Sequence, residues 1–163
     1  MEGWVIALII VAVIVLIAVI IICWAISVSN NFVRMRNTSE EAFATIDVYL
    51  KKRYDLIPNL VETVKGYAKH ESRTLEEVIK ARNNAASATT TAEKIEADAQ
   101  LSNAIKSINI VAERYPDLKA NTNFQNLMNE LRNIEAELAN SRKYYNGTVK
   151  VFNTEKDIFP KSI

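Results

Sequence analysis

The side chains that could carry chemistry are polar or charged residues placed in or beside apolar helical stripes. Such a group held between helices must be paired, because an unpaired buried charge costs several kcal/mol. Glu135 and Arg142 are seven residues apart on one predicted helix, so each needs its own partner from another helix. We expect inter-helix polar contacts that fix the register of a bundle, with a ligand or partner site as the alternative. The candidates are Arg53, Asp55, Pro58, Asn59, His70, Glu71, Arg82, Glu135, Arg142, Tyr145 and Asn146.

The sequence offers few residues that could carry out an enzymatic reaction. His70 is the single histidine, and the enzymatic hypothesis rests on an acid–base pair of His70 with Glu71. No Ser or Cys is placed to make a nucleophile–base pair with His70. A lone histidine beside one carboxylate does not make a transition-metal site, and three glycines do not form a phosphate-binding loop. We therefore predict no catalytic residues, no metal site and no cofactor.

A long amphipathic helix must position the first group of candidates. Apolar side chains recur every three or four residues from Phe32 to Ala68, and the pattern runs on through Leu75 to Arg82. Pro58 either begins a second helix, with Asp55 near its cap, or kinks a single long helix. Because the pattern is unbroken across Pro58, we favour a kink or tight corner.

Two further long helices follow. Residues 85–91 (AASATTT) are small and polar and predict a helix end and connector. A third helix places Ile95 in phase with Leu101, Ile105, Ile108 and Val111, and it ends near Tyr115, before Pro116. Pro116 to Lys119 fits a short turn of helix. The last helix runs to about Asp157, capped by Asn121 or Asn123, and its buried face is Phe124, Leu127, Met128, Leu131, Ile134, Leu138, Ser141, Tyr145, Val149 and Phe152.

The fold class follows from these patterns. No useful length of sequence alternates apolar and polar residues, and Gly and Pro total only six. We predict an all-α protein, in which a single N-terminal transmembrane helix is followed by an antiparallel bundle of three to five long helices. Residues 1–29 form the N-terminal tail and transmembrane helix, and residues 30–163 form the bundle. Asn30-Asn31 is the only plausible break between them.

The predicted span is residues 4–26, which contain no charged side chain. As a helix these 23 residues reach roughly 35 Å, enough to cross a bilayer with some tilt. Trp4 and Trp24 lie near the two ends, where indoles favour the headgroup region. A cleaved signal peptide is the alternative, but no Lys or Arg precedes the apolar run and the run is too long for one.

Flanking charge predicts the orientation and the compartment. Only Glu2 precedes the span, whereas Arg34, Arg36 and the run Lys51-Lys52-Arg53 follow it. The positive-inside rule then places the body in the cytoplasm and the N-terminus outside, in a single-pass protein of the cell (inner) membrane.

The body carries nearly balanced charge and no long basic run, so nucleic acid is not an expected partner. The single Cys23 lies in the span, so the body holds no disulfide.

Several strings of residues resemble the LemA family. They are 46–61 (IDVYLKKRYDLIPNLV), 64–71 (VKGYAKHE), 115–120 (YPDLKA) and 124–127 (FQNL), followed by Glu135, Ser141-Arg142, Tyr145-Asn146, Phe152-Asn153 and Phe159-Pro160. The resemblance covers nearly the whole chain. It implies a bacterial single-span protein with a helical-bundle body, no established enzyme activity and no agreed molecular function. Family members commonly continue past the Phe-Pro string with an apolar and aromatic tail, whereas this chain stops at Ile163.

The functional prediction is a non-enzymatic, membrane-anchored helical scaffold that self-associates. Its basis is an apolar span fused to a long amphipathic helix without visible chemistry. The span has no GxxxG pattern, so association is expected through the body. The expected partners are the lipid bilayer, further copies of this chain, and other membrane or soluble proteins. The alternative is a membrane-tethered sensor or adaptor that binds a soluble partner or small ligand through the polar candidates.

Overall fold

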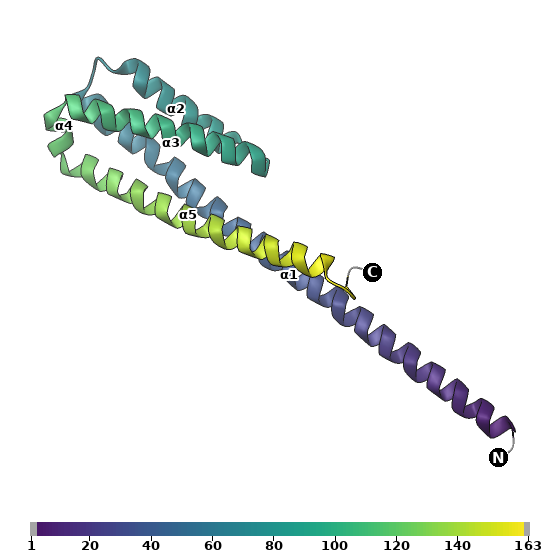
Figure 1. Cartoon of the computed structure of the whole chain (residues 1–163). Coiled ribbons are helices and arrows are strands. Elements are labelled where there is room, and N and C mark those ends of the chain that lie inside the picture. The colour runs from purple at the N-terminus through teal and green to yellow at the C-terminus, as the bar shows by residue number, and fades with distance from the viewer. Residues whose placement is uncertain (1–2, 162–163) are drawn as a thin grey trace. The chain divides into compact units, whose positions relative to one another are not determined.

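The computed structural model of the chain describes residues 3–161, and it is all-α, as predicted. Five helices follow one another in these residues (Figure 1): α1 (Gly3–Tyr67), α2 (Ser72–Ser87), α3 (Thr91–Arg114), α4 (Pro116–Ala120) and α5 (Thr122–Asp157). They contribute to two compact units. One comprises the chain up to residue 42 together with residues from 144 onward, and the other comprises residues 43–143.

The first part of α1 is the long apolar helix that the sequence predicts. Its most apolar 18-residue window has a mean hydropathy of 3.9, and none of that window is buried. By length and composition α1 is the one helix in the described part of the chain that could cross a membrane. Trp4 and Trp24 are both exposed and lie near the two ends of the apolar segment. The helix continues through Asn30 and Asn31 without a break, so the apolar segment and the first bundle helix are one element.

The turn after α1 falls at Ala68–Glu71 rather than at Pro58. Pro58 lies inside α1, so a second helix beginning there is wrong, and so is one helix running on to Arg82. The Ala68 amide still donates to Val64 O at 2.8 Å, and the Glu71 amide then donates to Ala68 O at 3.1 Å to close the turn. Buried residues on both sides of the turn keep the same spacing, so periodicity alone does not reveal the break.

The unit of residues 43–143 holds a continuous apolar core. Each helix in it contributes a buried face, and α2 packs along α3. The predicted buried face of α5 is confirmed from Phe124 to Ser141. The prediction that Ile95 shares the buried face of α3 is wrong, because Ile95 is 59% exposed. Six residues separate Ile95 from Leu101, which puts them roughly 120° apart around a helix. The largest fully buried apolar side chains are Ile57, Leu60, Val64, Val78, Leu101, Ile108, Val111, Leu118 and Leu138.

Local signals set the ends of the last three helices. Thr90 caps α3, and α3 ends at Arg114 because Tyr115 precedes Pro116, the first residue of α4. The Asn121 side chain accepts a hydrogen bond from the Phe124 amide at 2.9 Å, which caps α5. The predicted connector, short helix and Asp157 end point are confirmed.

In the other unit, the last part of α5 lies along α1 at the residues that follow the apolar segment and runs antiparallel to it (Figure 1). The Phe32 and Phe152 rings meet edge to face, with their centroids 5.9 Å apart. This contact fixes the register between the two helices within the unit.

Candidate functional site

A buried cluster of charges joins three helices in the unit of residues 43–143. Arg53 on α1 is 4% exposed, and its Nη1 atom lies 2.7 Å from Oδ1 of Asp98 on α3. The Nη2 atom of Arg53 lies 2.7 Å from Oε2 of Glu135 on α5. The second oxygen of Asp98 accepts a 2.6 Å hydrogen bond from Nη2 of Arg142, also on α5. The Asp98 carboxylate therefore bridges two guanidinium groups.

The members of this cluster differ in burial, and therefore in how strongly each one holds the helices together. Asp98 is 2% exposed, and a charge this deeply buried is tolerated only with its partners in place. The Glu135 side chain is 51% exposed, so water and salt weaken its attraction to Arg53. We expect the bridge through Asp98 to hold the three helices in register, with Glu135 adding little.

Two buried polar atoms beside the cluster have no hydrogen-bond partner among the described residues: Nε of Arg53 and the hydroxyl of Tyr54. The pKa of Tyr54 is raised to about 12, chiefly by burial and then by the negative charges of Asp98 and Asp47, against the opposite effect of Arg53 and Arg142. Tyr54 is therefore a neutral phenol at physiological pH.

Arg82 on α2 compensates for a hydrogen bond that Pro58 removes from α1. In a regular helix the amide of residue 58 would donate to the carbonyl of Tyr54, but proline has no amide hydrogen. The Nε atom of Arg82 donates to this same Tyr54 carbonyl at 3.4 Å. The bond is long, but it gives the freed carbonyl a charged donor and ties α2 to the point where α1 is weakest.

An open groove of about 390 Å³ lies where α1, α2 and the start of α3 meet. The residues that line it carry both signs of charge, with small alanines among them. The lining includes Asp47, Lys51, Asp55, Arg82, Ala85, Ala88 and Lys94. A concave site of this size, lined by a few charged groups and by apolar side chains, is able to accept a small polar molecule.

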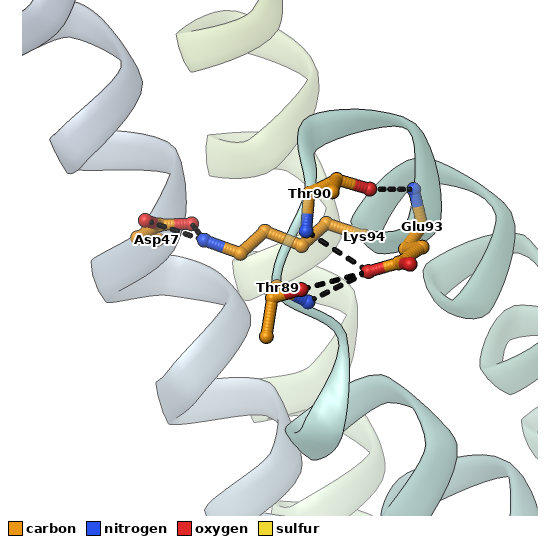
Figure 2. Close-up of polar contacts among 5 residues, drawn as sticks. All are labelled: Asp47, Thr89, Thr90, Glu93 and Lys94. Atoms are coloured by element: carbon orange, nitrogen blue, oxygen red, sulfur yellow. Dashed lines mark hydrogen bonds and ion pairs between the residues drawn. The ribbon is translucent and has the colours of Figure 1, made fainter.

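Lys94 closes one side of this groove. Figure 2 shows its side chain reaching from the first turn of α3 to α1, where Nζ lies 2.8 Å from both carboxylate oxygens of Asp47. The ammonium also lies 5.3 Å from the centre of the Phe43 ring, a favourable cation–π distance.

The side chain of Glu93, the residue before Lys94, points back toward Thr89 and Thr90 and caps α3. One oxygen of Glu93 accepts hydrogen bonds from the amides of Thr89 and Thr90, at 2.9 and 3.0 Å, and the Thr90 hydroxyl accepts from the Glu93 amide (Figure 2). The backbone hydrogen bonds from Thr90 and Thr89 lower the pKa of Glu93 to about 2. The cap therefore fixes the backbone from which Lys94 extends.

The predicted candidates separate into groups in the structure. Arg53, Glu135 and Arg142 meet in the buried cluster, while Asp55 and Arg82 line the groove. Pro58 and Asn59 are exposed on α1 and belong to neither.

The remaining candidates lie elsewhere. His70 is exposed in the turn after α1, and Glu71 pairs with Arg114 at 3.0 Å. Neither His70 nor Glu71 lines the groove. Tyr145 and Asn146 belong to the other unit, where the Tyr145 carbonyl accepts a 2.8 Å hydrogen bond from the Thr148 hydroxyl. In residues 3–161 no three His, Cys, Asp or Glu side chains are grouped as metal ligands.

Sequence reasoning missed the central residue, Asp98. A signal for it existed, because Asp98 lies three residues before Leu101, one turn back along the buried face of α3. A charged residue in that position requires a buried partner of opposite sign. Tyr54, Lys94 and Asp47 were also missed, and nothing in their local sequence distinguishes them from ordinary surface or core residues.

These features define a class: an all-α bundle whose first helix extends into a long apolar segment and whose core is joined by buried ion pairs. Residues 42–163 match the model of the LemA family, and the chain belongs to that family. It is similar to Protein LemA of Metamycoplasma hominis, with 24% identity over 127 residues. That alignment covers 77% of this chain and 58% of the relative, so the chain spans less than two thirds of the relative's length.

Proposed function

We propose that this protein is a non-enzymatic scaffold, anchored in the membrane by residues 4–26, that self-associates through its helical body. The observation that carries the proposal is the uninterrupted helix α1 (Gly3–Tyr67), which contains both the apolar segment and the first bundle helix. Because this helix is uninterrupted, no loop separates the apolar segment from the first bundle helix. Such an arrangement suits a protein that sets positions at a membrane.

The chemistry of the buried cluster supports a structural role. The charged groups of Asp98, Arg53, Glu135 and Arg142 are bound to one another, and the Asp98 carboxylate has a cation on each oxygen. A catalytic acid or base must instead reach a substrate. The cluster accordingly serves as a clamp between helices.

The last part of α5 offers a surface for self-association. Tyr144 and Val151 are both exposed and lie seven residues apart, so they present one apolar stripe two turns long. Stripes with this spacing pack against each other in helix–helix interfaces. The association surface in this proposal is the stripe of Tyr144 and Val151.

The particle size of the full chain in mild detergent tests self-association. We expect the full chain to run as an oligomer by size-exclusion chromatography with light scattering. Tyr144→Lys combined with Val151→Lys should shift the particle toward the monomer. Ile110→Lys is the control, because Ile110 is equally apolar and exposed but lies on α3. A monodisperse wild-type monomer at native-like concentration would contradict the proposal.

The proposed orientation places the body in the cytoplasm, and the basic residues after the span support it. In a Cys23→Ala background, an exposed Lys106→Cys substitution reports the side on which the body lies. We expect this thiol to resist a membrane-impermeant maleimide in intact cells and to react after lysis. Labelling of intact cells would place the body outside.

The groove favours a second candidate function, a membrane-tethered sensor or adaptor that binds a small polar ligand. Its charged lining and volume of about 390 Å³ are the supporting observations. A thermal-shift screen of the full chain with small zwitterionic and anionic compounds tests this function. A true ligand should raise the melting temperature of wild type, and Lys51→Ala, at an exposed lining position, should abolish the shift without lowering the unliganded value. Equal shifts in both proteins would exclude the groove as the site.

A further inference from the structure

Two large apolar side chains remain uncovered just after α5. Phe159 is 76% exposed and Ile158 is 49% exposed. This segment is held in place by its own backbone, because the Ile158 amide donates to Thr154 O at 3.1 Å and the Lys161 amide donates to Ile158 O at 2.9 Å. Among residues 3–161, an ordered backbone therefore presents two apolar side chains that no other part of the chain covers.

The register of the helix pair places these side chains along α1. Phe152 lies against Phe32, and the two helices run antiparallel. Ile158 is six residues beyond Phe152, and Ile26 is six residues before Phe32, so each is roughly 9 Å from the ring contact in the same direction. Ile158 and Phe159 therefore lie level with Ala25 and Ile26, one residue from the exposed Trp24.

That level is the boundary of the apolar segment. Trp side chains favour the zone between headgroups and acyl chains, and exposed apolar side chains such as Phe leave water by entering the same boundary. We propose that Ile158 and Phe159 insert into the headgroup–acyl boundary of the bilayer that residues 4–26 span, giving the protein a second membrane contact. The occupant is the lipid bilayer because the exposed pair continues the apolar surface of the span. This inference rests on the proposed anchor.

Quenching by brominated lipids tests the second contact. The full chain carrying Trp4→Phe and Trp24→Phe is given one new indole by Phe159→Trp and reconstituted in phosphatidylcholine vesicles brominated near the top of the acyl chains. We expect blue-shifted emission and a loss of intensity comparable with that of Trp24 in a chain carrying only Trp4→Phe. Glu137→Trp in the same background is the control, because Glu137 is exposed and lies twenty residues before the end of α5, roughly 30 Å of helix away. Its emission should be unaffected by bromine.

The outcomes separate this inference from the proposed anchor. A chain that fails to float with the vesicles contradicts the anchor itself. A chain that floats while the Phe159→Trp variant shows red-shifted, unquenched emission overturns the second contact alone. Blue-shifted but unquenched emission that changes on dilution into excess lipid would mean that a second copy of the chain covers this surface, which also overturns it. Far-UV circular dichroism checks folding, and Ile158→Trp replaces Phe159→Trp if the latter does not fold.

Discussion

The Nε atom of Arg82 donates a hydrogen bond to the carbonyl of Tyr54 at 3.4 Å. This carbonyl is the acceptor that Pro58 leaves without its amide partner, since residue 58 stands four positions after residue 54. The contact explains how α1 continues for a further nine residues beyond a proline, and why a charged residue on α2 lies beside the apolar stripe.

A double-mutant cycle tests this compensation. Arg82→Ala should lower the free energy of unfolding by about 1–2 kcal/mol, at or below the range of about 1.5–3 kcal/mol for a hydrogen bond to a charged group, because this bond is long at 3.4 Å. In a Pro58→Ala background the same substitution should cost less, because the alanine amide now donates to the Tyr54 carbonyl. Urea unfolding of the full chain in mild detergent, followed by circular dichroism, measures both. Arg73→Ala is the control on the same helix, since its side chain is 92% exposed and its pair with Glu77 is a surface one. Equal losses with and without Pro58 would contradict the compensation.

Removal of Asp98 should be the most destabilising single change in the charged cluster. Asp98→Ala leaves two guanidinium groups without their shared acceptor and should cost about 3–5 kcal/mol. Glu135→Gln should cost less than about 1 kcal/mol, because that side chain is half exposed. Chemical denaturation at neutral pH compares the two variants. If they proved equally stable, Asp98 would not be the centre of the clamp.

Acid should weaken the α3 cap over a defined pH range. The pKa of Glu93 falls from its ordinary 4.5 to about 2 on folding, so the stabilisation is complete above about pH 4.5 and disappears as pH falls toward 2. Glu93→Gln keeps a side chain that accepts the same hydrogen bonds but does not titrate. The variant should therefore show a shallower fall in unfolding free energy between about pH 5 and pH 3. Parallel curves for wild type and variant would show that Glu93 makes no such contribution.

The phenol of Tyr54 should ionise only at strongly alkaline pH in the folded chain. Its pKa of about 12 exceeds the usual 10, so the folded state is stabilised below about pH 10 and loses that contribution as pH rises through 12. Tyrosinate absorbance of the folded chain should show a late step, absent in Tyr54→Phe. Because the buried hydroxyl has no partner among the described residues, this variant should be as stable as wild type or slightly more so at neutral pH. A large loss of stability would reveal a partner for the hydroxyl.

Much of the fold was predictable because it depends on local properties. The apolar run of residues 4–26, the buried face of α5 and the cap at Asn121 each follow from one stretch of chain. The need for partners at Glu135 and Arg142 was predictable for the same reason, since a charge on a buried face requires an opposite charge wherever the chain supplies one. The prediction for Ile95 was wrong because this residue is out of phase with the residues of α3 that the core buries.

The sequence by itself determined the helices, their buried faces, the apolar segment and which charges needed partners. Only the tertiary structure decided which partners they found: Arg53 meets Asp98 from 45 residues away, and Arg82 meets the Tyr54 carbonyl from 28 residues away. It also decided that the chain turns at Ala68–Glu71, although the spacing of buried residues continues through the turn. The physical reason is that periodicity describes one helix against an unspecified core, whereas a buried ion pair depends on how several helices pack around that core.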